Sequence, residues 1–170
     1  KAISELRSLG ADHLEILSGD KSAAVRRLAE KVGITEYSAE LLPQDKLDRF
    51  EKIYEENSKK GSVAYVGDGL NDSPVIIRSD VGFAMGKGGA ALSAKAADIV
   101  IVNDDIENVP RAVKIAKKTR KIVIGNIVFS LGVKALIMAV CLIWNPIMEL
   151  AVLADVGVTL LAVLNCARIK

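Results

Sequence analysis

A short apolar run at positions 62–66 ends at Gly67 and leads directly into two carboxylates, Asp68 and Asp72, and the amide of Asn71. An apolar run of this length between turn residues is typical of a strand buried in a parallel sheet. Open α/β sheets bind ligands at the carboxyl ends of their strands. Carboxylate oxygens are ligands that Mg²⁺ prefers, with waters and phosphate completing its shell. The segment therefore predicts a site for Mg²⁺ and phosphate.

The glycines around Asp68 leave two interpretations open. Gly67-Asp68-Gly69 alone also fits an ordinary turn after a strand. The longer string is more specific, because Gly67 and Gly69 allow close approach of a ligand to the backbone. Asn71 is predicted to cap a helix that tolerates Pro74 in its first turn. The whole string from Gly67 to Pro74, GDGLNDSP, resembles the GDGxNDxP signature of P-type ATPases, which belong to the haloacid dehalogenase superfamily.

Two shorter motifs precede this string in the order found in that family. Ser18-Gly19-Asp20 follows the apolar-rich segment 14–17 and resembles the family's (T/S)GD motif. Lys46 resembles the family's phosphate-binding lysine. Taken alone, these residues fit a helix cap and a solvated lysine better than a phosphate site, and their order and spacing before GDGLNDSP reverse that preference. The resemblance implies that Ser18, Lys46 and Asn71 bind phosphoryl oxygens.

The same resemblance implies the metal roles and the energy source. Asp68 is the expected Mg²⁺ ligand, and Asp72 is expected to shape the shell of that ion. The family forms an aspartyl-phosphate on a DKTGT motif, which splits a hard step into two easier ones. No DKTGT string occurs in this sequence. The resemblance thus implies the carboxy-terminal part of a longer pump, which is inactive as an isolated chain. ATP would be bound mainly by domains that are not in this sequence. The rest of the pump polypeptide would be the partner of this chain.

Residues 1–105 alternate between helical and strand patterns, which predicts an α/β fold with a parallel sheet and helices on both faces. The resemblance implies the latter part of a haloacid-dehalogenase-like (Rossmann-like) phosphorylation domain. Predicted helices cover 3–9, 21–32, 44–58, 71–77 and 90–96, and predicted strands cover 14–17, 62–66, 81–84 and 99–102.

Beyond residue 121 the composition changes, although averages of 51% hydrophobic and 26% charged residues conceal this. The stretches 122–143 and 147–167 are almost wholly apolar, and each, at roughly 20 residues, is long enough as a helix to cross a bilayer. They predict a two-helix transmembrane hairpin with an extracytosolic turn at 144–146. An amphipathic basic stalk helix is predicted at 106–121, and 168–170 form a cytosolic tail.

Basic residues flank both ends of the predicted hairpin, and positive flanks stay cytosolic. We therefore expect a multi-pass protein of the plasma membrane whose catalytic domain and both hairpin ends face the cytosol, with the lipid bilayer as a partner. A basic cluster beside a membrane span does not favour nucleic-acid binding. The basic residues are Arg111, Lys114, Lys117, Lys118, Arg120, Lys121, Arg168 and Lys170.

The predicted hairpin contains two opposite charges at similar depth. Lys134 and Asp155 lie roughly 11 and 10 residues from the turn, so antiparallel helices would place them level with each other. Charges inside a bilayer are costly, are usually paired and often mark substrate pathways. A structural ion pair that locks two helices and a transport site are both compatible with this placement.

Asn126, Lys134 and Asp155-Val156-Gly157 resemble the last two helices of the zinc/cadmium/lead group of heavy-metal-transporting P-type ATPases. The resemblance implies that Asp155 binds the transported ion, Zn²⁺, Cd²⁺ or Pb²⁺, and that Lys134 is its counter-ion. It implies an ion-translocating ATP hydrolase that exports these ions. Alternatives are a non-catalytic membrane fragment or regulatory subunit derived from such a pump, and a membrane-anchored phosphatase.

The remaining candidate ligands have simpler interpretations. Cys141 and Cys166 lie near opposite ends of the hairpin, which favours apolar packing for both. His13 is the only histidine and has charged or polar neighbours, so a solvated surface position is expected. Glu149 fits either a solvated group or a residue on a metal exit path.

Overall fold

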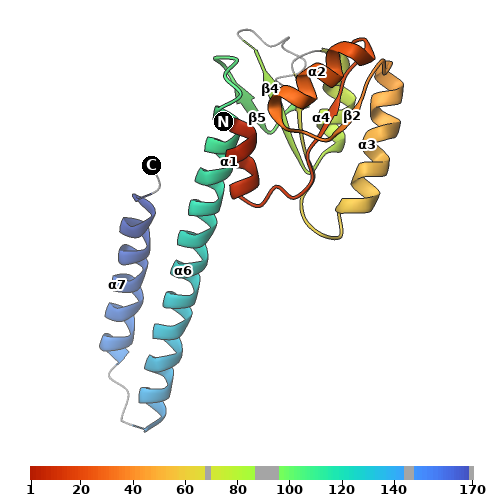
Figure 1. The fold of residues 1–170 in the computed structure, drawn as a ribbon. Helices are drawn as coiled ribbons and strands as arrows, with labels where there is room; N and C mark the ends of the chain where they lie inside the picture. The colour runs from red at the N-terminus through yellow and green to blue at the C-terminus, as the bar shows by residue number, and fades with distance from the viewer. Residues whose placement is uncertain (68–69, 87–95, 144–147, 169–170) are drawn as a thin grey trace. The chain divides into compact units, whose positions relative to one another are not determined.

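The computed structural model describes residues 1–67, 70–86, 96–143 and 148–168, in two compact units, 1–110 and 111–170 (Figure 1). The first unit alternates helices and strands as predicted. Its elements are α1 (Ala2–Ser8), β1 (Glu15–Leu17), α2 (Ser22–Val32), β2 (Glu36–Ser38), α3 (Pro43–Asn57), β3 (Ala64–Gly67), the 3₁₀ turn η1 (Leu70–Asp72), α4 (Ser73–Arg78), β4 (Val81–Met85) and β5 (Ile99–Ile101). The other unit contains most of α6 (Asn108–Ile143) and all of α7 (Met148–Cys166).

All the strand pairings of the first unit are parallel, as predicted, but the strands form two separate ladders instead of one sheet. β1 pairs with β2, in the register Glu15 to Glu36. β3, β4 and β5 form the second ladder in that order, with Val66 opposite Phe83 and Phe83 opposite Ile99. Among the described strands, β1 and β3 are therefore not paired with each other.

Two local predictions were wrong. Strand β2 was not predicted, because its three residues, Glu36, Tyr37 and Ser38, carry no apolar alternation. The segment predicted as a helix from Asn71 begins instead as η1, and Asp72 takes the N-cap position of α4 without a side-chain cap hydrogen bond. The predicted helix at 90–96 lies outside the described residues except for Ala96.

Helix α3 contacts both ladders. Arg49 on α3 pairs with Glu15 of β1 through two hydrogen bonds of 2.8 and 2.9 Å. One position further along, the ring of Phe50 packs edge-on against Tyr65 of β3, with centroids 5.8 Å apart. The two ladders are thus neighbours beneath one helix.

The core of the first unit lies between α4 and β4. Val75 and Ile76 of α4 and Phe83 and Ala84 of β4 are each at most 2% exposed. Gly82 is required here, because a Cβ on it would lie 2.6 Å from a side-chain carbon of Ile76. This packing holds α4, and with it the preceding η1, against the second ladder.

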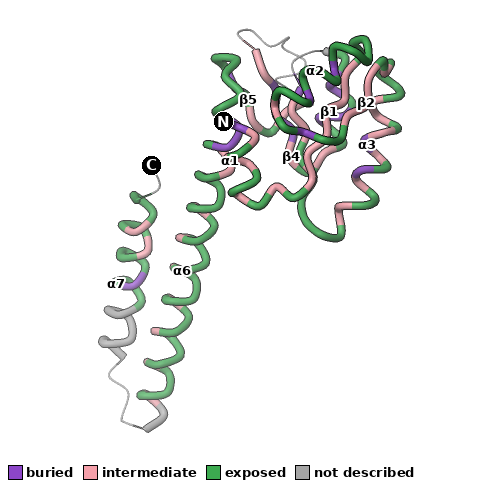
Figure 2. Tube along the Cα trace, in the orientation of Figure 1, coloured by how far each residue is buried: buried purple, intermediate pink, exposed green. Residues whose placement is uncertain are grey.

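The second unit consists of apolar helices with few buried side chains. Among the described residues, one helical segment, Asn108–Cys141 of α6, is long and apolar enough to cross a membrane. The apolar segment Asp155–Cys166 of α7 is shorter than such a span. Figure 2 shows α6 as exposed along most of its length. Large apolar side chains at least 41% exposed include Val123, Ile124, Ile127, Val128, Phe129, Leu131, Leu136, Met138 and Val140. The segments predicted as stalk and first span form one continuous helix of 36 residues.

Candidate functional site

The carboxylate of Asp72 is the centre of the first candidate site. Its side chain is 9% exposed, and Oδ1 lies 2.8 Å from Nζ of Lys46, whose side chain is 16% exposed. The hydroxyl of Tyr65 donates a hydrogen bond of 3.2 Å to the same oxygen. Because η1 follows β3 and Lys46 lies in the first turn of α3, the contact brings two of the predicted site residues together beside the carboxyl end of β3.

Gly67, the last residue of β3, is predicted from sequence to allow a ligand to approach the backbone closely. In the structure, the side chain of Asp72 is one group that lies this close to Gly67. A Cβ on Gly67 would lie 2.7 Å from Cβ of Asp72 and 3.2 Å from its Oδ2. Asp72 therefore packs directly against the end of the strand, with Oδ1 taken up by Lys46 and Tyr65 and Oδ2 on the side of Gly67.

The other predicted phosphate-site residues are placed less completely. Ser18 directly follows β1, where its Oγ accepts a hydrogen bond from the backbone N–H of Asp20 at 3.1 Å, as in a tight turn. Asn71 is exposed in η1. Asp68 and Gly69, expected to hold Mg²⁺ and to allow ligand approach, lie outside the described residues.

The second unit contains the other candidate site. Nζ of Lys134 on α6 lies 2.8 Å from Oδ1 of Asp155 on α7, so the predicted contact between the two is confirmed. Their side chains are 56% and 55% exposed, and Thr159 donates a hydrogen bond to the backbone carbonyl of Asp155. Between two apolar helices, this ion pair is the arrangement expected for charges inside a bilayer.

Asn126 makes a second polar connection between α6 and α7. Its Nδ2 donates to the carbonyl of Ala162 at 3.1 Å and to Sγ of Cys166 at 3.3 Å, and its Oδ1 accepts from Asn165 at 2.7 Å. Cys166 is exposed and hydrogen-bonded, which differs from the apolar packing expected for it, whereas Cys141 is half-buried. Carboxamides that bond across helices add specificity to helix pairs in membranes.

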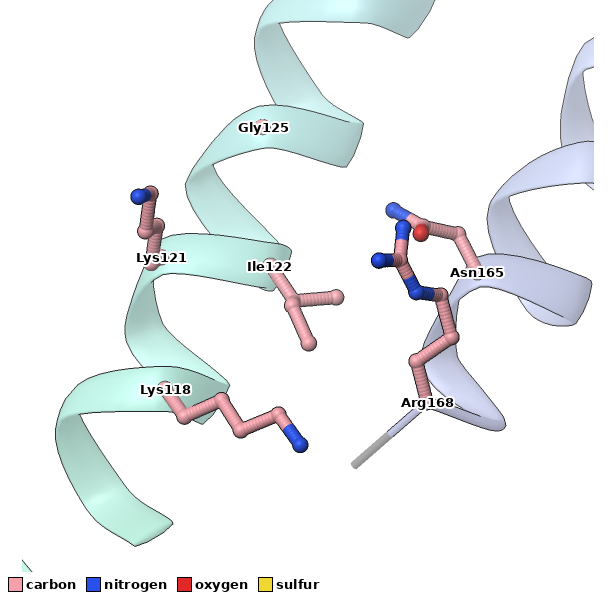
Figure 3. Close-up of a pocket in the computed structure, with 6 residues that line it drawn as sticks. All are labelled: Lys118, Lys121, Ile122, Gly125, Asn165 and Arg168. Atoms are coloured by element: carbon pink, nitrogen blue, oxygen red, sulfur yellow. The ribbon is translucent and has the colours of Figure 1, made fainter. Parts of the chain in front are cut away.

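A groove of about 420 Å³ lies beside the Asn126 network (Figure 3). Ile122, Asn165, Arg168 and Lys118 point toward the space between the helices in this view, whereas Lys121 points away. The full lining is Lys118, Lys121, Ile122, Gly125, Asn165 and Arg168. The basic residues of this lining, Lys118, Lys121 and Arg168, belong to the predicted cytosolic flanks of the hairpin.

Sequence reasoning missed three partners in these sites. Tyr65, Asn165 and Cys166 contact Asp72 or Asn126, yet none of them stands in a recognised motif. Asn165 offered a signal, since a carboxamide within an apolar stretch needs a hydrogen-bond partner. Tyr65 offered none, because an aromatic residue in a strand is ordinary core.

The parallel α/β ladders, with polar residues directly after β1 and after β3, define a haloacid dehalogenase-like fold. The model of that family, described as haloacid dehalogenase-like hydrolase, matches residues 1–80. The chain is also 43% identical over 169 residues to the zinc-transporting ATPase of Synechocystis sp. (strain ATCC 27184 / PCC 6803 / Kazusa), and this match covers 99% of the chain and 23% of that relative. It is 42% identical to the cadmium, zinc and cobalt-transporting ATPase of Bacillus subtilis (strain 168), with 99% and 24% covered.

A solved structure agrees with these relatives. The crystal structure of a zinc-transporting PIB-type ATPase in the E2.Pi state superposes with a TM-score of 0.88 at 33% identity, covering 99% of this chain and 27% of that chain. The chain is therefore a homologue of the heavy-metal-transporting P-type ATPases, and the resemblance noted in its sequence is confirmed. It spans about a quarter of the length of the curated relatives it matches.

Proposed function

We propose that this chain is the carboxy-terminal part of an ATP-driven exporter of divalent heavy-metal ions, Zn²⁺, Cd²⁺ or Pb²⁺. The observation that carries the proposal is the 2.8 Å ion pair between Lys134 and Asp155 on two apolar helices, in a chain whose first unit has a haloacid dehalogenase-like fold. An ion pair in such helices suits a cation path, because a carboxylate can exchange an internal ammonium group for a transported ion. The names of the relatives support zinc and cadmium as substrates.

The first unit would carry the phosphoryl chemistry. The donor set fits Mg²⁺, since the carboxylate of Asp72 lies at the end of β3 with Oδ2 on the side of Gly67. Asp68 and Asp72 would hold the ion, which supplies neutralisation of phosphoryl charge when bound. Lys46 holds Asp72 in place through Oδ1, and its ammonium group, together with Asn71 and Ser18, would orient phosphoryl oxygens.

The two separate ladders suggest where the phosphorylated aspartate would enter. Helix α3 contacts β1 through Arg49 and β3 through Phe50, and among the described strands β1 and β3 each pair along one edge only. Unpaired strand edges template pairing with a further strand. A strand ending in the aspartate of a DKTGT motif would join the ladders beneath α3, beside Ser18, Gly67 and Asp72.

The second unit would form the last membrane hairpin, with α6 and α7 as its two spans. Basic residues before the first span and after the second would keep both ends in the cytosol, together with the first unit. Exposed apolar side chains on both helices fit a lipid bilayer and neighbouring helices of the same pump at the plasma membrane. We assign the phosphorylation domain to residues 1–105, the stalk to 106–121 and the two spans to 122–143 and 147–167.

The test uses a complete pump that contains this chain, purified and reconstituted in lipid vesicles. Asp155→Ala is expected to abolish Zn²⁺-stimulated ATP hydrolysis and uptake, because the ion loses its carboxylate ligand. Asp68→Ala is expected to abolish Mg²⁺-dependent phosphoenzyme formation from ATP. Glu30→Ala, at a side chain 67% exposed on the same unit, is the control that retains both activities. Zn²⁺ stimulation that survives Asp155→Ala would overturn the transport assignment.

A second measurement separates the pump from the alternative functions. The isolated chain is expected to take up no label from ATP and to hydrolyse no p-nitrophenyl phosphate, because its sequence has no DKTGT aspartate. Turnover of p-nitrophenyl phosphate by the chain alone would instead establish a membrane-anchored phosphatase. Absence of transport by every complete pump that contains the chain would favour a regulatory membrane fragment.

A further inference from the structure

His13, Glu15 and Glu36 meet at the end of the first ladder that is opposite to Ser18. Glu15 and Glu36 begin β1 and β2 and are register partners, so their side chains leave the ladder next to each other. Nε2 of His13 lies 3.6 Å from Oε2 of Glu15, and Nδ1 lies 3.6 Å from Oε1 of Glu36. One ligand atom from each of the three residues lies within 4.8 Å of the other two.

The contacts within this His13 cluster leave polar groups incompletely satisfied. His13 is half-buried, with a side chain 30% exposed, so the expected solvated position was wrong. Its Nε2 is buried without a hydrogen-bond partner, since 3.6 Å is too long for a hydrogen bond. Two carboxylates directly opposite on neighbouring strands repel each other. A cation between the three groups would remove both costs.

Glu15 is prepared to act as an anionic ligand. Its side chain is only 3% exposed, and this burial acts to raise the pKa of the carboxyl group, but hydrogen bonds from Arg49 and Ser38 outweigh it and lower the pKa of Glu15 overall. Oε1 accepts from both Arg49 and Ser38, whereas Oε2 accepts from Arg49 alone. The second lone pair of Oε2 therefore remains for a ligand on the side of His13.

We propose that His13, Glu15 and Glu36 form a binding site for a divalent transition-metal cation of the Zn²⁺ class. Zn²⁺ takes imidazole nitrogen and carboxylate oxygen at roughly 2.0–2.2 Å, so two of its ligands in tetrahedral geometry are about 3.4 Å apart. The nitrogen of His13 that binds the ion lies 3.6 Å from one of the two carboxylates, which is close to that spacing. One ligand atom of each residue lies within 4.8 Å of the others, so the second carboxylate moves inward to complete the set. One imidazole nitrogen binds the ion, and water completes its shell.

This site is independent of the proposed transport path and of the phosphate site. It uses the amino-terminal ends of β1 and β2, whereas Ser18 follows the carboxyl end of β1. An ion there joins β1 to β2, and Glu15 of β1 is also held by Arg49 on α3, so binding stabilises the first unit. The site would let the soluble unit respond to the cytosolic level of a metal ion.

The experiment uses the 170-residue chain in detergent micelles, with Mg²⁺ in excess and with Asp155→Asn in every sample to remove the membrane carboxylate. Zn²⁺ is titrated by calorimetry, and the imidazole signals are followed by NMR. Because His13 is the only histidine, the signals report on one residue without any further variant. The expected result is one Zn²⁺ per chain with a shift of the His13 signals that saturates at one equivalent.

Variants then assign the ligands. His13→Gln and Glu36→Gln are each expected to weaken Zn²⁺ binding by about 100-fold or more, because each removes one of three protein ligands. Glu30→Gln, at a side chain 67% exposed on α2, is the matched control and is expected to bind Zn²⁺ normally. Unchanged His13 signals at saturating Zn²⁺, or full binding by His13→Gln, would overturn the proposal. If His13→Gln does not fold, the NMR titration of the chain that retains all three ligands decides whether His13 binds Zn²⁺.

Discussion

Gly67 lies so close to Asp72 that a Cβ added at position 67 would be 2.7 Å from Cβ of the aspartate. Gly67→Ala is therefore expected to displace Asp72 and to lower the free energy of unfolding by about 1–3 kcal/mol, as overpacking does. Thermal unfolding followed by circular dichroism measures this loss. Gly61→Ala is the control, because nothing lies within 4 Å of the position a Cβ would take there. Equal unfolding temperatures for the two variants would contradict the close packing.

The Lys46–Asp72 ion pair leads to a second prediction. Both side chains are largely buried, so Lys46→Met leaves a carboxylate without its ammonium partner and is expected to cost about 3 kcal/mol. Lys46→Met combined with Asp72→Asn is expected to be less destabilised than the sum of the single variants. A double-mutant cycle from denaturant unfolding measures this coupling. Lys52→Met, at an exposed position on the same helix, is the control. Additive effects of Lys46→Met and Asp72→Asn on the free energy of unfolding would argue against the Lys46–Asp72 ion pair.

Glu15 gives a pH dependence with a defined sign. Hydrogen bonds from Arg49 and Ser38 outweigh burial and hold the pKa of Glu15 below its ordinary value, about 4.5. A depressed pKa in the folded state contributes stability above the unfolded-state pKa and loses it as pH falls through the folded pKa. The difference in unfolding free energy between the unsubstituted chain and Glu15→Gln is therefore expected to be constant above about pH 5.5 and to shrink at lower pH. A difference that grows on acidification would contradict this linkage.

Asn126 permits a test of the helix pair itself. Asn126→Ala removes its hydrogen bonds to Ala162, Cys166 and Asn165, and such bonds in membranes contribute about 0.6 kcal/mol on average. We expect α6 and α7 to separate more readily, by about 0.5–1.5 kcal/mol in total. Fluorescence transfer between labels on the two helices measures the separation as detergent is increased. Leu131→Ala, at a side chain on α6 that is largely exposed, is the control that leaves the transfer unchanged.

The regular elements of the first unit were predictable because their patterns are local. Helix α3 lies within one residue of its predicted bounds at both ends, and β5 begins at the predicted residue and ends one residue earlier than predicted. Strand β2 was not predictable, since its polar residues become a strand only by pairing with β1. The division into two ladders is likewise a tertiary property that no periodicity reveals.

The contacts within the candidate sites also divide into those that follow from local sequence and those that depend on tertiary structure. The level placement of Lys134 and Asp155 followed from counting residues along two helices joined by a turn, and the structure confirms their contact. Lys46 and Asp72 were each expected at a phosphate site, but their direct contact joins residues 26 positions apart. His13 was placed on a solvated surface, because only the pairing of β1 with β2 brings Glu36 beside it.

The two ladders also bear on how the first unit assembles. Each ladder joins strands that follow one another along the chain, β1 with β2 and β3 with β4 and β5, so its paired residues are only 16 to 21 positions apart. Helix α3 supplies the contacts that hold one ladder to the other, through Arg49 and Phe50. Short-range pairings form faster than long-range ones. We therefore expect the two ladders to form as separate local units, with docking of α3 across both of them as the later step.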